Sequence, residues 1–253
     1  MITVDFRLDD MLEVADEASW VASDAFFAGD LALIAEYHTT PNESHSYFLT
    51  HDRSAIWGVP GEPQLAAIKI TRDLGERTFT FEAARHAGLA FAQNWLAERG
   101  CPPEKIIPGD DFLKPADDLT ARAEQQVRES GERYRVIDTY TRDSEPCETW
   151  TLVHDSRAAE LPIRVFLEEA DLDAGTYTVR EGAFADEWAA VAWLSERPGP
   201  LPEPPEHRAT AERRTRAARS RSTGTPLSPK AGAQDSAAKP SPASQLPTRG
   251  RTL

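Results

Sequence analysis

The sequence predicts an α+β fold built as a tandem duplication, in which each copy is an α-β-β-β-β-α unit. Two observations lead to this: the chain resembles itself at a fixed spacing, and both copies show the same succession of helix and strand patterns. A change of composition near residue 200 adds a third part. We expect a first repeat at residues 1–103, a second at 104–199, and a disordered, basic, Pro/Ser/Arg-rich tail at 200–253.

The self-similarity lies in two blocks. Residues 73–99 match residues 171–197 at ten of 27 positions without a gap, where ordinary composition would give about two. Upstream, residues 31–52 match residues 134–155 at five positions. The spacing between the blocks differs by five residues in the loop around residues 58–63. Surface loops tolerate such length changes, so the difference does not argue against duplication.

Each copy is expected to begin with a helix, to continue as four strands of an antiparallel sheet, and to close with a second helix. Alternating side chains indicate the strands, and Asn, Asp, Ser and Pro between them indicate turns. Both helices are expected on one face of the sheet. The expected elements are 9–27, 31–39, 45–51, 65–71, 77–82 and a helix around Trp95, then 116–130, 134–141, 148–154, 161–168, 176–180 and a helix around Trp193.

Residues 101–115 connect the copies. Prolines interrupt this segment, while Ile106 and Phe112 make it too apolar for a free linker. It is therefore expected to pack along the domain boundary.

Charge is distributed unevenly along the chain. The net charge is −14, yet residues 204–253 hold ten Lys/Arg and only three Asp/Glu, so the body is strongly acidic. An acidic body opposes nucleic-acid binding. The basic tail offers possible phosphate contacts, alongside the simpler possibilities of a solvated tail or one that lies on its own body. The arginines concerned are Arg213, Arg214, Arg216, Arg219 and Arg221.

Cysteine usage and the first residues indicate the compartment. Cys101 and Cys147 stand alone, the N-terminus has no secretory pattern, and no apolar run is long enough for a membrane span. We expect a bacterial cytoplasmic protein with no membrane partner, with arginine usage as the sign of its bacterial origin.

Three histidines on the first hairpin form a candidate metal site. His38, His45 and His51 are placed so that a hairpin could bring their imidazoles together, and imidazole is a common ligand of Zn²⁺. The second copy has Thr141 and Glu148 at the first two positions, so such a site would not belong to the shared unit. Histidine is also common on strands, and the sequence does not require any cofactor.

The repeated pair His51-Asp52 and His154-Asp155 is a second candidate. A metal or acid–base role is possible, but adjacent strand residues point to opposite faces of a sheet. A structural role is favoured, in which Asp starts the turn after the second strand and His packs at the sheet edge.

No motif identifies a reaction. The chain has no P-loop, no dinucleotide-binding glycine pattern, no nucleophile elbow and no zinc-protease helix. The repeated aromatic residues are more typical of a core than of a pocket. The sequence favours a non-catalytic binding or accessory protein with an unknown protein partner. The alternatives are an enzyme or small-ligand or metal binder with its site in the groove between repeats, and a weak nucleic-acid contact through the tail.

Overall fold

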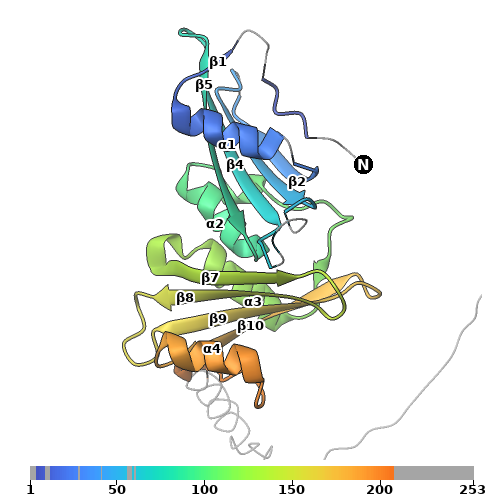
Figure 1. Cartoon of the computed structure of the whole chain (residues 1–253), viewed down its shortest axis with the longest axis vertical. Coiled ribbons are helices and arrows are strands. Elements are labelled where there is room, and N and C mark those ends of the chain that lie inside the picture. The colour runs from blue at the N-terminus through green and yellow to red at the C-terminus, as the bar shows by residue number, and fades with distance from the viewer. Residues whose placement is uncertain are drawn as a thin grey trace, which may run out of the picture. The chain divides into compact units, whose positions relative to one another are not determined.

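The computed structural model describes residues 4–8, 12–27, 29–40, 42–55, 59 and 61–207 (Figure 1). The mixed α+β class predicted from the sequence is confirmed. Within these residues there are two five-stranded sheets. The first unit contains β1 (Glu13–Val14), α1 (Glu17–Phe27), β2 (Leu31–His38), β3 (His45–Asp52), β4 (Leu65–Asp73), β5 (Thr78–His86) and α2 (Leu89–Glu98). The second unit contains β6 (Lys114–Pro115), α3 (Asp118–Arg128), β7 (Tyr134–Arg142), β8 (Cys147–Asp155), β9 (Ile163–Asp171), β10 (Thr176–Phe184) and α4 (Glu187–Glu196).

The two sheets share one topology. Their strand orders are β1-β5-β4-β3-β2 and β6-β10-β9-β8-β7, with the short first strand parallel to its neighbour and all other pairs antiparallel. Even the irregularity of the first hairpin is shared, since the register shifts between Leu33 and Ala35 in one sheet and between Val136 and Asp138 in the other. The short strands β1 and β6 were not predicted, because two residues are too few to show an alternating pattern.

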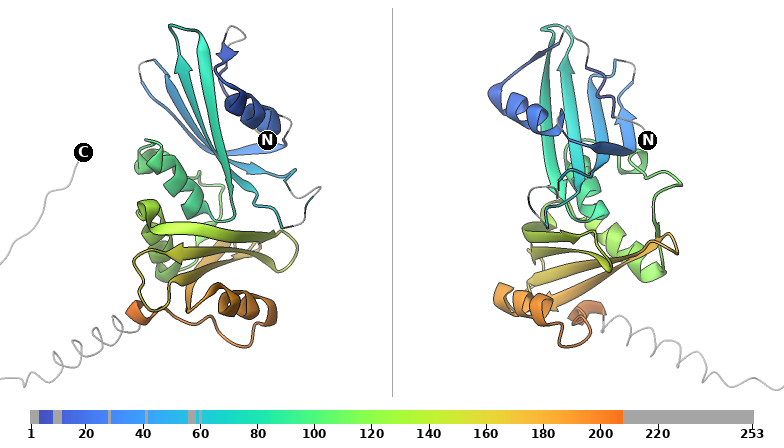
Figure 2. Two further views of the ribbon diagram at one scale, coloured as in Figure 1. Left: turned by 60° about the vertical axis from the view of Figure 1, so that its left-hand side comes forward. Right: turned by 45° about the vertical axis from the view of Figure 1, so that its right-hand side comes forward.

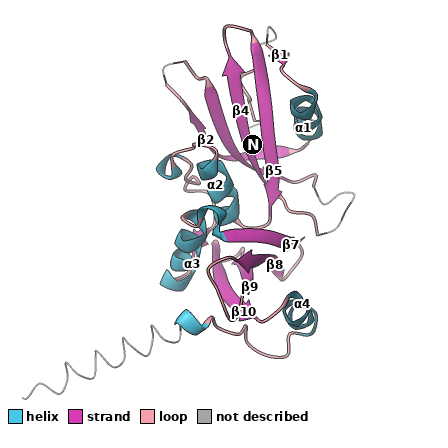
Figure 3. Cartoon of the chain, turned by 90° about the vertical axis from the view of Figure 1, so that its left-hand side faces the viewer, coloured by secondary structure: helices cyan, strands magenta, loops and turns pink. Residues whose placement is uncertain are grey.

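The helices lie on opposite faces of each sheet, so the expectation of helices on one face is wrong (Figure 3). In the first unit, Phe26 of α1 packs on a face that includes Phe48, whereas Leu96 of α2 packs on a face that includes Leu49. Adjacent residues of a strand face opposite ways, and Phe48 and Leu49 are both fully buried. A sheet that is apolar on both faces needs a helix on each side.

Both opening helices begin later than the sequence predicted: α1 starts at Glu17 rather than at residue 9, and α3 starts at Asp118 rather than at residue 116. Residues 9–11 lie outside the described residues, and α1 starts after Asp16, whose carboxylate accepts a hydrogen bond from the Ser19 amide at 2.7 Å. Asp117 caps α3 in the same way, through the Thr120 amide at 2.8 Å. One side-chain oxygen capping the free amides of a first turn is the usual N-cap arrangement.

The repeated Trp and Arg of the closing helices form a pair in each unit. The Arg99 guanidinium lies 3.6 Å from the centre of the Trp95 ring, and Arg197 lies 4.7 Å from that of Trp193. Spacing of four residues places both members on one side of a helix. The repeated tryptophans thus belong to helix packing, since Trp193 is buried and Trp95 packs against the first core.

The units meet through α2, α3 and the intervening segment (Figure 2). Phe91 of α2 packs with Tyr134 and Phe166 of the second unit. The linker packs as predicted, since Ile106 is fully buried in the first core and Leu113 lies against the second.

The loop after β3 also reaches the second unit. The Gly61 carbonyl accepts a hydrogen bond from the Thr141 amide at 3.0 Å. Gly61 has a φ of 93°, and a Cβ there would lie 2.6 Å from the Tyr140 ring. Only glycine allows this contact without displacing the ring.

Packing continues past residue 199, where the sequence predicted the tail to begin. The Pro202 carbonyl accepts from the Ala183 amide at 2.9 Å, and Leu201 packs against the core beside α4. Glu206 accepts a hydrogen bond from Arg164 at 2.5 Å. Residues 200–207 are therefore part of the second unit.

A fully buried aspartate ends the second hairpin strand of each unit. Asp52 forms an ion pair with Arg85 at 2.5 Å, and Asp155 accepts two hydrogen bonds from Arg133 at 2.7 and 2.8 Å. Burial acts to raise the pKa of each carboxyl, but the hydrogen bonds and nearby arginines outweigh burial, so both pKa values are lowered. Both aspartates are thus buried as charged, paired groups.

Besides Arg133, an arginine of the sheet lies near this aspartate, and it is on a different strand in each unit. In the first sheet it is Arg85 on β5, which pairs directly with Ala66 on β4. In the second sheet the corresponding pair is reversed, with Arg164 on β9 opposite Ala183 on β10. Arg164 lies 3.5 Å from Asp155. Both sheets therefore have an arginine beside the buried aspartate, but each has alanine at the position where the other has arginine.

This exchange predicts a rescue. Arg85→Ala should lower the free energy of unfolding by about 3 kcal/mol, because it leaves the Asp52 carboxylate buried without its partner. Adding Ala66→Arg to that variant should recover part of the loss, since the arginine then occupies the strand position that Arg164 occupies in the other sheet. Denaturant unfolding of both variants, with Ala66→Arg alone completing the cycle, measures the coupling. A double variant no more stable than Arg85→Ala would contradict the equivalence of the two positions.

Candidate functional site

The three histidines of the candidate metal site do not converge. His38 pairs directly with Ser46, so it lies on the α1 face of the first sheet, where its ring contacts Phe48. His45 and His51 lie on the α2 face, and His45 stacks on Tyr47 at 6.5 Å. The described part of the chain holds no group of three or more His, Cys, Asp or Glu side chains arranged for a metal. The predicted site required His38 to lie across from His45. In the structure His38 pairs with Ser46, so the register differs by one residue.

The repeated His-Asp pairs are divided between two faces, as strand geometry requires. Asp52 and Asp155 start turns: their carboxylates each accept from the backbone amide two residues later, Ser54 and Arg157, at 3.0 Å. His51 is on the opposite face of its strand, where it hydrogen-bonds to Gln64 and where burial lowers its pKa. Neither pair forms a dyad.

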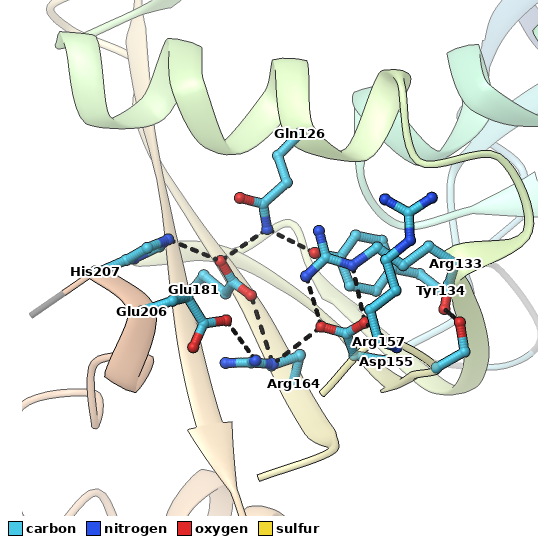
Figure 4. Close-up of polar contacts among 10 residues, drawn as sticks. Gln126, Arg133, Tyr134, Asp155, Arg157, Arg164, Glu181, Glu206 and His207 are labelled. Carbon is cyan, nitrogen blue, oxygen red and sulfur yellow. Dashed lines mark hydrogen bonds and ion pairs between the residues drawn. The ribbon is translucent and has the colours of Figure 1, made fainter. Parts of the chain in front are cut away.

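Around Asp155 the structure forms an extended polar network (Figure 4). Arg164 bridges Asp155 and Glu181, and Glu181 accepts from Gln126 at 3.0 Å and lies 3.5 Å from His207. Burial raises the pKa of Glu181. The network ties α3, three strands and residues 206–207 together, which is a structural role.

A groove of about 450 Å³ opens where the two units meet. Its walls come from the end of β3 and the start of β4, the start of α2, the linker before β6, the β7–β8 hairpin and the β9 surface of the second sheet. Most of the wall surface is apolar, and the apolar residues include Leu65, Leu89, Phe112, Leu113, Ala170 and Leu172. Charged and polar side chains, among them Arg53, Arg142, Asp143, Glu148 and Glu168, also line it. The sequence placed a possible ligand site between the repeats without identifying these residues.

Glu168 on β9 is the distinctive polar group of the groove. It also lines a small cavity of about 20 Å³ under α2 and α3, together with Glu124 of α3. Burial raises the pKa of Glu168 to about 8, and the nearby Glu124 adds to the effect. Burial likewise raises the pKa of Glu124, although its carboxylate accepts a hydrogen bond from the Tyr177 hydroxyl at 2.5 Å.

Sequence reasoning missed Glu168, although the repeat contained a signal. Glu168 lies opposite Thr149 and Val179. The same place in the first sheet, opposite Ser46 and Phe81, is occupied by Ile70, which is fully buried. A carboxylate where the other unit has a core isoleucine marks a departure that folding does not explain.

The two cysteines have different settings. Cys101 is buried in the first core, and burial raises the pKa of its thiol to about 12, which makes it unreactive at neutral pH. Cys147 lines the groove, where its Sγ donates to the Asp143 carbonyl at 3.5 Å.

The tail arginines Arg213, Arg214, Arg216, Arg219 and Arg221 lie outside the described residues, so a phosphate contact there stays a prediction. None of the helices in the described ranges reaches the length and apolar character that a membrane crossing requires. Comparison of the chain with protein-family models, curated proteins and solved structures finds no match.

The raised pKa of Glu168 predicts how stability changes with pH. Its folded pKa of about 8 lies above the ordinary value of 4.5, so between these values the folded protein holds a proton that the unfolded chain releases. Stability should therefore fall as pH rises through this window. Glu168→Gln removes that dependence and should be more stable than the native chain by up to about 5 kcal/mol at pH 9, with little difference at pH 4, since one pKa unit corresponds to about 1.4 kcal/mol.

Chemical unfolding across this pH range measures the effect. The matched control is Glu169→Gln, which makes the same change at the exposed neighbouring position. Equal pH profiles for the two variants would show that Glu168 is not held in its protonated form.

Proposed function

We propose that this chain is a non-catalytic binding protein whose groove between the units holds a small, largely apolar ligand. The observation that carries the proposal is the groove itself: about 450 Å³, built by both units and the linker, with a wall surface that is mostly apolar. Ligand pockets in proteins commonly enclose about 300–1,000 Å³ with this balance of surfaces.

Binding is favoured over catalysis by the state of the reactive groups in the groove. The Cys147 thiol donates to a backbone carbonyl, and His51 is hydrogen-bonded to Gln64 with a lowered pKa. Their hydrogen bonds thus go to other groups, whereas a nucleophile and its base would be bonded to each other. Arg53 is paired with Asp30 at 2.5 Å. These groups therefore line the groove without forming a catalytic set.

We also propose that the two units arose by duplication and that the groove formed where they were joined. The shared strand order, the shared bulge and the equivalent aspartate caps support a common origin. The ten matching positions between residues 73–99 and 171–197 support it independently. On this view the groove belongs to neither ancestral unit, because both units contribute to its walls. Related sequences would test this: each half should match the other half across relatives, with the groove residues as the exceptions.

The ligand site can be tested with Nile red, a neutral apolar dye whose fluorescence rises in apolar surroundings. The native full chain should bind it, and Ala170→Trp should weaken binding at least about tenfold, because the indole fills the floor of the groove. Ala174→Trp is the control, since it introduces the same side chain at an exposed turn. Circular dichroism confirms that both variants are folded. Equal binding by the two variants, or no binding by the native chain, would remove the groove as a ligand site.

A further inference from the structure

We infer that the ligand of the groove carries a cationic amine, held by the Glu168 carboxylate while its apolar body lies against the walls. The inference rests on the proposed function and adds the chemical class of the ligand.

Glu168 has no cation of its own. In the described part of the chain, its carboxylate has no hydrogen bond or ion pair among the interactions found. It lines the groove, so its oxygens are reachable from there. A carboxylate in largely apolar surroundings without a partner is unfavourable, and an ammonium group would supply the missing charge.

The described groups around Glu168 include a second carboxyl group. Glu124 faces it from α3, Tyr177 lies behind Glu124 on β10, and Thr149 lies opposite it on β8. Arg128 of α3 acts on Glu124 and Tyr177, while the threonine and the phenol are uncharged. Two carboxyl groups close together favour a cation over a second anion.

The cations at the groove rim are engaged elsewhere. Arg142 donates to the Pro146 carbonyl at 3.0 Å and lies 3.9 Å from Glu148, while Arg53 is paired with Asp30. His51 faces Asp143 and Arg53, and burial lowers its pKa, so it is neutral at pH 7. Cys147 is the remaining titratable group of the wall. Among the described residues of the wall none supplies a cation to Glu168, so we expect the ligand to supply it.

Comparison of the units gives independent support. Where the second unit has Glu168 and Glu124, the first has Ile70 and Ser23, with Ser23 placed seven residues after its helix cap as Glu124 is. Ile70 shows that this position accepts an ordinary core residue. Two carboxylates here weaken the core, which is understandable if the second unit binds a cation at this point.

An organic amine fits better than a metal ion. Divalent cations need several oxygen ligands around them, and no group of three or more candidate ligands occurs among the described residues. Glu148 of the wall is already paired with Arg142 and Arg197, whereas Glu168 beside the apolar part of the wall suits an ammonium group on a hydrocarbon chain or ring.

Binding of an amine should be linked to proton release. In the empty groove Glu168 is largely protonated at pH 7, because its pKa is about 8. An ammonium binds only the ionised form, so affinity should rise about tenfold per pH unit from pH 6 towards pH 8. A ligand that accepts a hydrogen bond from the protonated carboxyl would show the opposite trend.

The test compares hexylamine with 1-hexanol, which shares its chain but not its charge. Calorimetric titration of the native full chain at pH 6, 7 and 8, in two buffers of different ionisation enthalpy, gives the affinities and the protons released. Hexylamine should bind at least about tenfold more tightly than hexanol at pH 8, with about one proton released at pH 7. Glu168→Gln should lose the preference, and Glu169→Gln should keep it. In Glu124→Gln the pH profile should move to lower pH, because the neighbouring charge is gone.

The outcomes separate the two proposals. If Nile red and hexanol bind but hexylamine has no advantage, the groove is a site and the amine is wrong. The inference is likewise overturned if the affinity for hexylamine decreases as pH rises, or if the native chain and Glu168→Gln bind hexylamine with equal affinity. Failure of Nile red, hexanol and hexylamine alike overturns the groove itself. Saturable stabilisation by CaCl₂ or MgCl₂ that requires Glu168 would replace the amine with a metal.

Discussion

The rest of the structure depends on one constraint: each sheet buries a charged aspartate at the end of its second hairpin strand. Asp52 and Asp155 each hold the following turn through a backbone amide and hold neighbouring strands through arginine. An ionised carboxylate cannot remain buried without a cation. A cation is therefore required although its position is not: Arg85 supplies it to Asp52, while Arg133 and Arg164 supply it to Asp155. Both units have this aspartate because the same side chain holds the turn and forms the ion pair.

Much of the fold could be predicted because it depends on local pattern. Alternation predicted the strands, and Asp117 predicted the start of α3. The sequence contained a sign that helices cover both faces of each sheet, since Phe48 and Leu49 are adjacent apolar residues in one strand. The prediction nevertheless placed both helices on one face. β1 and β6 could not be predicted, because pairing with β5 and β10 alone makes these two-residue segments into strands.

The candidate site was less predictable because it has no local pattern. Its walls come from segments far apart in the chain, such as Leu65, Phe112 and Ala170. The histidines attracted attention by residue type, yet one-residue register decides which face a strand side chain occupies, and His38 lies on the other face from His45. In the sequence, Glu168 is an ordinary polar residue near the end of a strand. Its unusual character becomes clear only when its position is compared with that of Ile70 in the first sheet. The sequence thus predicted that a site could lie between the units, while the residues that form it could be identified only from the structure.

The two units also differ in what packs on the face of the sheet beside their opening helix, and this difference contributes to the groove between them. In the first unit, Phe6 of the N-terminal segment packs its ring against Phe48 and Phe81. Arg72 is buried close by and donates to the Phe6 carbonyl at 2.7 Å, so the face is closed. In the second unit the start of α2 covers only part of the corresponding face, and Ala170 stands where Arg72 stands in the first. The small Ala170 leaves space, and the neighbouring Glu168 provides a carboxyl group without a partner. Space and an unpaired carboxyl group at one point of a shared framework are typical of a binding site. The first unit has Arg72 and Ile70 at the same positions, so the framework itself requires neither.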